Sequence, residues 1–387
     1  MDDAQSPEDA IGMAESRYDL FDKYAAGNDE HGFLAEPVVT ALHDTGLVRA
    51  FLPRDLGGLE LRPTAAMRLI ATVSYGDPSA GWVGMALATA GGWAGAFLPK
   101  DTVRHLFAEQ SRTAIAGQGT KPGRAVPVTG GHLVSGEWSF ASGIKHATHV
   151  HTAAIDAETG QSRFFILPFA DVTVLDNWDV IGLRATGSLD YVLNDVFVPL
   201  SFSYPSLSRE PVTGGDLYRL GVGNLASINH GSWALGVGRR LLHELAALVR
   251  RRAGRAGSSG ESEVFHDGYA TAEARLRSAE AFLFEVWHDI ESTQSAGKAP
   301  SVRQETLNRL ALSNATWSVH AVADFVYRSA GTMAMREGVI QRLYRDVQAG
   351  IQHVSSSPVI RQSCGRELAG LADGEQWVHF RLTRPDG

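Results

Sequence analysis

The sequence has one cysteine and no excess of basic residues, which argues against a disulfide-stabilised protein and against a nucleic-acid-binding one. Cys364 is alone among 387 residues, so an internal disulfide is impossible and a reducing compartment, the cytoplasm, is expected. The formal net charge is −8, with both signs mixed along the chain, which argues against a nucleic-acid-binding protein. The acidic N-terminal segment lacks a basic start followed by an apolar run, so we expect no secretory signal.

Charged residues are also missing from residues 78–99, a stretch long enough to cross a bilayer. Glycine and alanine are abundant there, where a membrane span would carry leucine, isoleucine and valine. We therefore expect a tightly packed buried helix and no membrane span.

The short motifs of several enzyme classes are absent as well. The chain has no phosphate-binding Gly-x-x-x-x-Gly-Lys motif, no dinucleotide fingerprint after an expected strand, and no His-Glu-x-x-His or Gly-x-Ser-x-Gly run. His146, His149 and His151 lie close together in the sequence. Two of them alternate along an expected strand and no other ligand type is near, so we expect no metal site.

What is present divides into three regions. Residues 1–108 have the apolar spacing of helices, residues 109–203 contain short β-rich segments between turn residues, and residues 204–387 are helical again. Long amphipathic segments in the last region cover 234–251, 273–291, 304–328 and 338–354. We predict an α+β fold with an N-terminal helical domain, a central β-barrel domain and a C-terminal four-helix bundle.

Five segments, in this order, resemble the acyl-CoA dehydrogenase superfamily over nearly the whole chain. The segment 116–125 resembles the loop at the mouth of its flavin site, although Lys121 departs from the common Thr-Glu-Pro form. The other segments resemble the strand pair behind the flavin ring, the Gly-x-Arg strand and the last bundle helices, and they cover 130–150, 182–199, 327–335 and 342–358. The resemblance implies the same three-domain fold and a flavin cofactor.

The catalytic base distinguishes the branches of this superfamily. Many of its dehydrogenases have a Glu nine residues after the Arg of an Arg-Asp pair, but counting from Arg345 leads to Val354. A second lineage places the base in an earlier helix, where Ala226–His230 offers no carboxylate. Proton abstraction beside a thioester needs a positioned base, which valine cannot supply. His353, together with Ser142-Gly143 where dehydrogenases often have Asn-Gly, resembles instead the two-component flavin hydroxylases.

That branch implies a monooxygenase that receives FMNH2 or FADH2 from a separate reductase and forms a C4a-hydroperoxide with O2. It would then hydroxylate a small or carrier-bound organic substrate at carbon or nitrogen. His353 would be the acid/base, because an unperturbed imidazole titrates near neutrality, and Ser142 would bond to the N5 region of the flavin. These hydroxylases often carry another His near the position of Ala88 or Thr89, and its absence disfavours a phenol as the substrate.

The resemblance also implies flavin contacts in the central region. Gln118 and Thr120 would lie at the ring edge, beside the turn that Gly143 forms with Ser142. Trp138 and Phe140 would form an apolar wall, although their alternation fits two core side chains equally well.

Four further flavin contacts are implied outside that segment. Arg184 belongs to the Gly-x-Arg strand, and Arg345 either shapes the flavin pocket or forms a structural pair with Asp346. Arg252 would meet the flavin phosphates of an adjoining subunit, unless it only ends a helix in solvent. Gly331 would approach the flavin across a subunit contact, unless it is a helix stop. The family expectation is a homotetramer.

Two alternatives stay open. The first is an FAD-dependent dehydrogenase of acyl thioesters whose base is a carboxylate elsewhere, for which Glu337 is a poorly placed candidate. The second is a member without catalysis that serves as a structural or regulatory subunit. The substrate and the choice between FMN and FAD stay open under each of these hypotheses.

Overall fold

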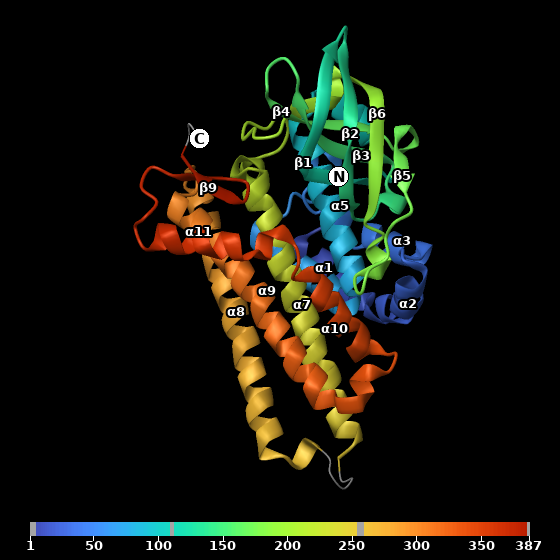
Figure 1. Ribbon diagram of the computed structural model, residues 1–387, viewed down its shortest axis with the longest axis vertical. Helices are drawn as coiled ribbons and strands as arrows, with labels where there is room; N and C mark the ends of the chain where they lie inside the picture. Colours follow the sequence, from blue (N-terminus) through green and yellow to red (C-terminus); the bar gives the residue numbers. More distant parts are fainter. Residues whose placement is uncertain (1–4, 109–111, 254–258, 385–387) are drawn as a thin grey trace.

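The computed structural model describes residues 5–108, 112–253 and 259–384, with the sheet at one end and long helices extending away from it (Figure 1). The N-terminal helices are α1 (Pro7–Ser16), α2 (Tyr18–His31), α3 (Glu36–Asp44), α4 (Pro63–Gly76), α5 (Pro78–Phe97) and α6 (Lys100–Leu106). Four of them begin with a proline in the first turn, where the missing N–H removes no helical hydrogen bond.

Helix α5 is the buried helix predicted for residues 78–99. Every residue of α5 is buried except Trp82, Ala86 and Thr89, whose spacing places them in one stripe. Glycine allows the close packing: a Cβ at Gly84 would lie 2.4 Å from the Leu47 side chain. Among the described residues, no helix is long and apolar enough to span a bilayer.

The central region forms one seven-stranded mixed sheet in the order β5-β6-β2-β1-β3-β4-β7. Its strands are β1 (Ile115–Val128), β2 (Gly131–Ala141), β3 (His149–Asp156), β4 (Ser162–Pro168), β5 (Thr173–Leu175), β6 (Leu189–Pro199) and β7 (Ser203–Pro205). Neighbours pair antiparallel except β1 and β3, which are parallel. The β domain is therefore where the sequence predicts it, and short strands occupy both ends of the sheet order.

The C-terminal helices are α7 (Val222–Arg251), α8 (Glu263–Ser295), α9 (Val302–Ala330), α10 (Val339–Gly350) and α11 (Pro358–Leu368), followed by a hairpin of β8 (Gln376–Val378) and β9 (Arg381–Thr383). Helix α7 begins at Val222, earlier than predicted. The sequence did not indicate its first turns, because their residues are mostly small or polar and lack apolar periodicity. Helix α10 ends at Gly350, so His353 lies outside the helix expected for 338–354. The predicted domain boundaries stay a prediction.

Candidate active site

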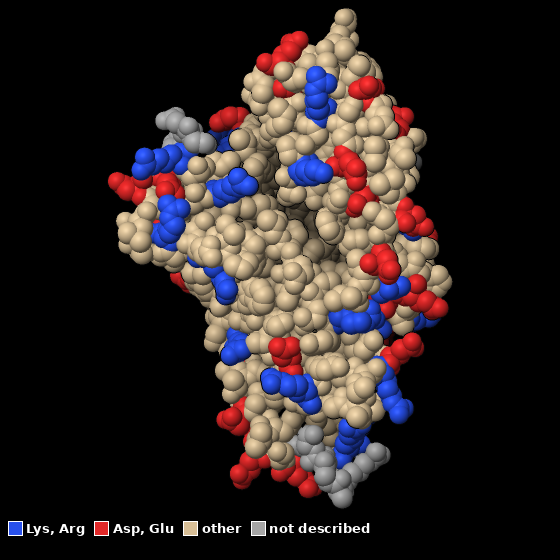
Figure 2. All heavy atoms as spheres, in the orientation of Figure 1, with Lys and Arg blue, Asp and Glu red and all other residues tan. Residues whose placement is uncertain are grey.

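A cleft lies where α5 and α7 meet the sheet. The open stripe of α5, formed by Trp82, Ala86 and Thr89, approaches a part of α7 where Ala226 and His230 are also partly exposed. The surface is hollowed between the sheet and the helices, near α7 (Figure 2). We name this region the α5/α7 cleft.

Two stacked histidines lie in the α5/α7 cleft. The rings of His230 and His353 have centroids 3.6 Å apart and an interplanar angle of 20°. The Trp82 ring meets both edge-on, at 4.9 Å from His230 and 5.9 Å from His353. Burial lowers the pKa of His353 to about 4, and burial followed by the charge of His353 lowers the pKa of His230 well below its usual value. Both rings are therefore neutral at neutral pH.

One tautomer of His353 is favoured by its own turn. The Ser355 backbone N–H donates to His353 Nδ1 over 3.2 Å, and Ser355 Oγ lies 2.8 Å from the same nitrogen. Because a backbone N–H can only donate, Nδ1 holds the lone pair and the proton of the neutral ring is on Nε2. His353 can therefore donate a hydrogen bond through its Nε2–H.

A chain of hydroxyl groups orients Ser142. Trp82 Nε1 donates to Ser142 Oγ over 3.1 Å, and Ser142 Oγ lies 2.7 Å from Ser188 Oγ. Ser188 Oγ in turn lies 2.7 Å from Thr186 Oγ1, which donates to the Leu183 carbonyl over 2.7 Å. Each hydroxyl has one hydrogen and a carbonyl only accepts, so Ser188 donates to Thr186 and Ser142 donates to Ser188. Ser142 Oγ therefore keeps one lone pair with which it can accept a further hydrogen bond.

The turn after Ser142 requires glycine. Gly143 has φ +76°, a conformation that other residues rarely adopt, and a Cβ there would lie 2.8 Å from the Val83 side chain on α5. Its N–H donates to the Thr186 carbonyl over 2.9 Å. The Ser-Gly pair therefore joins the end of β2 to both α5 and the Thr186 segment, next to Trp82.

Trp138 and Phe140 do not share one face of β2. Trp138 is 0% exposed, stacks on Tyr191 at 5.3 Å and donates through Nε1 to the Ala153 carbonyl, so it packs as a core residue. The pairing of β2 with β6 shifts register between Trp138 and Ala141. Phe140 lies in this shift with φ +68° and is 64% exposed. Trp138 therefore fits the core alternative, and the contact of Phe140 with a flavin stays a prediction.

Gln118 organises the adjoining loop. Its Oε1 accepts from the backbone N–H groups of Gly119 and Thr120, each over 2.7 Å, and from the Thr120 hydroxyl over 2.9 Å. Its Nε2 donates to the Ser139 carbonyl over 3.2 Å. Gln118 and Thr120 thus form a prearranged edge beside the strand that carries Phe140. Their contact with a flavin stays a prediction.

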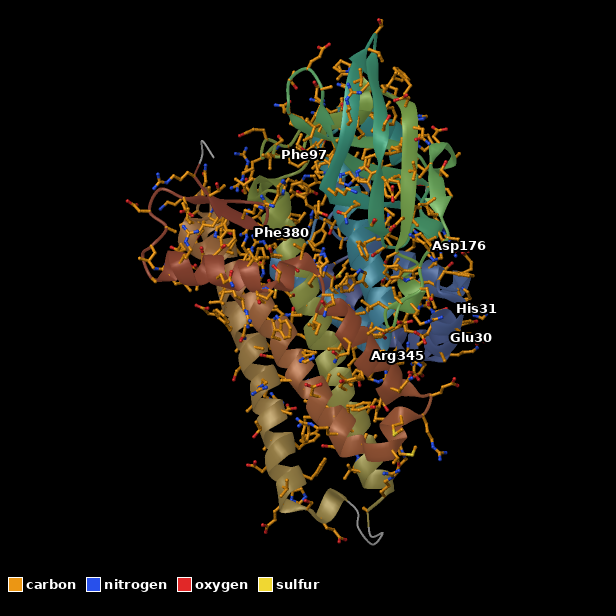
Figure 3. The ribbon with its side chains drawn as sticks, viewed as in Figure 1. Glu30, His31, Phe97, Asp176, Arg345 and Phe380 are labelled. Carbon is orange, nitrogen blue, oxygen red and sulfur yellow. The ribbon has the colours of Figure 1, made fainter. Side chains whose placement is uncertain are left out.

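Arg345 and Asp346 join α10 to the Gly-x-Arg segment. Arg345 pairs with Asp29 of α2 over 2.6 Å, and it lies beside α2 in Figure 3. The Leu183 N–H donates to Asp346 Oδ1 over 2.6 Å. Arg184 donates to the backbone carbonyl of Asp29 over 3.1 Å. These contacts hold the segment that leads into Thr186 and Ser188. Arg345 pairs with Asp29 instead of Asp346, and its predicted role in shaping a flavin pocket stays a prediction.

Arg252 lies far from the α5/α7 cleft within one chain, and Gly331 follows the last residue of α9. Arg252 follows the last residue of α7, about 30 Å along the helix from His230 at 1.5 Å per residue. Gly331 follows the last residue of α9 with φ +61°, a conformation that favours glycine. Their predicted contact with the flavin of another subunit stays a prediction.

Four residues of the site were not predicted from the sequence: Trp82, Ser188, Asn229 and His230. Trp82 links Ser142 to the histidine pair, yet it lies in a stretch that is apolar on every face and has no periodic signal.

In residues 5–108, 112–253 and 259–384, no group of three or more His, Cys, Asp or Glu could hold a metal ion. His151, one of the three clustered histidines, is buried and lies 2.8 Å from the Tyr204 hydroxyl.

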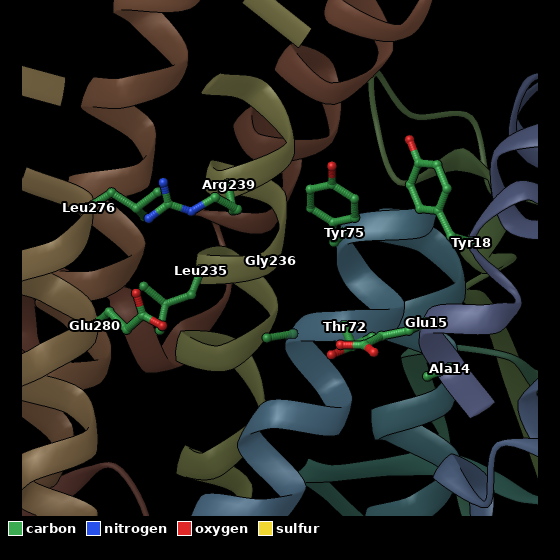
Figure 4. A pocket seen from close by; sticks show the side chains of 11 residues that line it. Ala14, Glu15, Tyr18, Thr72, Tyr75, Leu235, Gly236, Arg239, Leu276 and Glu280 are labelled. Carbon is green, nitrogen blue, oxygen red and sulfur yellow. The ribbon is translucent and has the colours of Figure 1, made fainter. Parts of the chain in front are cut away.

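A second hollow, shown in Figure 4, lies between the N-terminal helices and the bundle. This lateral cavity has a volume of about 500 Å³ and is lined by Ala14, Glu15, Tyr18, Ala71, Thr72, Tyr75, Leu235, Gly236, Arg239, Leu276 and Glu280. Its cation is already paired, because Arg239 donates to both carboxylate oxygens of Glu273 over 2.8 Å. None of the residues predicted for the site lines it.

Known proteins match the chain in sequence and in structure. Residues 228–358 match the family model described as acyl-CoA dehydrogenase, C-terminal domain. An indole-3-acetate monooxygenase of Pseudomonas putida is 29% identical, over 88% of this chain and 89% of the relative. The flavin-dependent monooxygenase oxygenase subunit HsaA of Mycobacterium tuberculosis is 27% identical, over 84% and 86%. XiaF from Streptomyces, solved with FADH2 and glycerol, has a TM-score of 0.87 at 22% identity, over 94% and 96%.

These matches confirm the predicted class, a flavin-dependent monooxygenase with helical, β and helical regions in that order. The chain resembles two-component flavin-dependent monooxygenases over most of its length, and its residues 228–358 match the acyl-CoA dehydrogenase C-terminal domain.

Proposed function

We propose that the protein is the oxygenase component of a two-component system and hydroxylates a small aromatic compound in the α5/α7 cleft. The observation that carries the proposal is the neutral His353, which offers an N–H beside Trp82 and Ser142. No carboxylate contributes to the pKa of His353, and Val354, at the dehydrogenase base position, is 41% exposed and aliphatic. The cleft therefore suits oxygen transfer better than removal of an α-proton.

The cleft has groups that fit a reduced flavin ring. Such a ring is flat, apolar on its faces and carries a hydrogen on N5, and the free lone pair of Ser142 is a matching acceptor. When bound, reduced flavin supplies the electrons with which O2 is activated. Ser142, with Gly143, would hold the N5 edge, and Phe140 would cover one face of the ring. Gln118 and Thr120 would contact the ring edge.

His353 would act on the oxygen atom that is transferred. Its Nε2–H can donate a hydrogen bond to that oxygen, and the surrounding aromatic rings exclude water. Because its pKa is low, the ring stays neutral and does not release a stray proton into the cleft at neutral pH. We propose this donor role as the form that its predicted acid/base function takes.

The relatives support the division of labour. One of them is an oxygenase subunit by name, and XiaF was solved with FADH2, so a separate flavin reductase is the natural partner. Indole-3-acetate and related small aromatics are the first substrates to test, because of the relative named for indole-3-acetate. A homotetramer in which Arg252 and Gly331 reach a neighbour's flavin, and a cytoplasmic location, belong to the same proposal.

The test is reconstitution with an NAD(P)H-dependent flavin reductase under ¹⁸O2, with a panel of aromatic compounds. We expect a product that carries one ¹⁸O atom and appears only when reduced flavin is supplied. A matched incubation with FAD and acyl-CoA thioesters addresses the dehydrogenase alternative. Bleaching of FAD by a thioester, without labelled aromatic product, would contradict the proposal.

A further inference from the structure

A buried amide oxygen next to the histidine pair has no hydrogen-bond partner. Asn229 precedes His230 on α7 and is 4% exposed. Its Nδ2 donates to Thr89 Oγ1 over 2.8 Å, whereas Oδ1 has no partner among the described residues. Buried polar atoms are nearly always paired, and an unpaired acceptor destabilises the fold unless something binds to it.

The hydroxyl of Thr89 determines which end of the amide is free. Thr89 Oγ1 donates its only hydrogen to the Met85 carbonyl over 2.8 Å, as a helical threonine does. It can therefore only accept from Asn229, which places Nδ2 toward Thr89 and leaves the carbonyl oxygen unpaired. The unmet group is thus an acceptor and needs a donor.

This acceptor belongs to the α5/α7 cleft. Thr89 is part of the open stripe of α5 and lies two turns from Trp82, about 10 Å along the helix. His230, adjacent to Asn229, stacks on His353. A planar bicyclic molecule that lies along the stripe from Trp82 would approach Thr89, the residue to which the Asn229 amide is hydrogen-bonded.

We propose that Asn229 Oδ1 selects substrates that carry a neutral hydrogen-bond donor, a ring N–H of the indole or pyrrole kind, at the end remote from the hydroxylated carbon. The inference rests on the proposed function, because it treats the α5/α7 cleft as the substrate site. A site built to satisfy a polar group discriminates strongly against an analogue that leaves that group unpaired.

Binding of matched probes tests the proposal without any turnover. Indole, 1-methylindole and benzofuran have similar flat shapes, but only indole has an N–H donor. Titration calorimetry of the full chain should give a dissociation constant for indole about tenfold lower than for the other two. Equal affinities for the three probes, or no binding of any of them, would overturn the proposal.

Two variants assign the preference to the residue. Asn229→Leu keeps the branched shape and the number of side-chain heavy atoms and removes the acceptor, so it should bind the three probes within about twofold of one another. Ser232→Ala is the matched control on α7, because its hydroxyl bonds only to the Ile228 carbonyl in the same helix, and it should keep the tenfold preference. An indole preference that persists in Asn229→Leu would contradict the assignment to Asn229.

Thermal unfolding of both variants controls for folding, and the wild-type comparison stands if Asn229→Leu does not fold. The outcomes also separate the two levels of proposal. An indole preference in a protein that yields no ¹⁸O-labelled product would support the binding site and contradict the proposed function. Labelled product without an indole preference would support the proposed function and contradict only the role of Asn229.

Discussion

The α5/α7 cleft and the lateral cavity of Figure 4 are both hollows beside α7, but they differ in the state of their polar groups. In the lateral cavity, Arg239 is paired with Glu273, and the Tyr75 hydroxyl lies 2.8 Å from His243 Nδ1. In the cleft, Asn229 Oδ1 is unpaired, Ser142 has a free lone pair and His353 offers a free N–H. The comparison indicates that unmet hydrogen bonding, more than volume, distinguishes a binding site.

The largest difference should come from removing the imidazole in the cleft. We expect His353→Ala to lower the hydroxylated product formed per flavin oxidised by about 100-fold, because the donor to the transferred oxygen is lost. Thr72→Val in the lateral cavity is the matched control and should leave this ratio unchanged. The measurement is product against hydrogen peroxide with the aromatic compound that the wild type accepts. If the His353→Ala enzyme formed as much hydroxylated product per flavin oxidised as the wild type, the distinction between the two hollows would be contradicted.

The hydroxyl chain gives the next largest effect. In Ser188→Ala, the Ser142 hydrogen is no longer held by Ser188 and can turn toward the flavin. Oxidised flavin presents an acceptor at N5, so the ratio of affinities for reduced over oxidised flavin should fall about tenfold. Anaerobic titrations with FMNH2 and FMN measure both constants, and Ser232→Ala again serves as the control. An unchanged ratio would show that the chain does not orient Ser142.

The cleft also predicts a pH dependence of stability. The pKa of His353 is about 4 in the folded protein, below that of an unfolded histidine, so the unfolded chain binds more protons between these values. The free energy of unfolding should therefore fall as pH decreases from about 6.5 to about 4, by about 2.5 kcal/mol from this residue. Chemical denaturation of wild type and His353→Phe over this range measures the difference in slope. Parallel curves would contradict the low pKa.

Asp346 should give the opposite pH dependence of stability. Burial raises the pKa of Asp346 to about 7, although the hydrogen bond from the Leu183 N–H acts to lower this pKa. Its contribution to stability is present at low pH and is lost as pH rises toward 7. Asp346→Asn keeps an acceptor for Leu183 without a buried charge, so it should become about 1 kcal/mol more stable than wild type above pH 7. Denaturation at pH 5 and pH 8 checks this, and an equal difference at both values would be inconsistent with it.

Much of the fold could be predicted from the sequence, because the signals were periodic or compositional. The order of helical, β and helical regions followed from apolar spacing, and the burial of α5 followed from its lack of charge. Ser142 and His353, found by resemblance, both contact Trp82. The residues between them were not predictable, because a helix buried on nearly all sides has no periodic stripe to reveal that Trp82 and Thr89 face a cleft.

Other features depended on single backbone positions. A strict period of two places Trp138 and Phe140 on one face, but the register shift before Ala141 and the left-handed Phe140 send them to opposite environments. Asn229 acts through one unpaired atom, which no sequence pattern records. Arg252 lies far along α7 from the cleft of its own chain, so a role for it at a flavin depends on a second chain.

Rapid mixing with oxygen tests the central claim most directly. The protein is loaded with FMNH2 or FADH2 without oxygen, mixed with O2, and followed by absorbance and by O2 consumption at the same time. We predict that O2 disappears first and that oxidised flavin returns in a later, slower phase, with a shorter delay in His353→Ala. Oxidised flavin that returns in a single phase, at the rate of free flavin and in step with O2 loss, would contradict oxygen activation in the α5/α7 cleft.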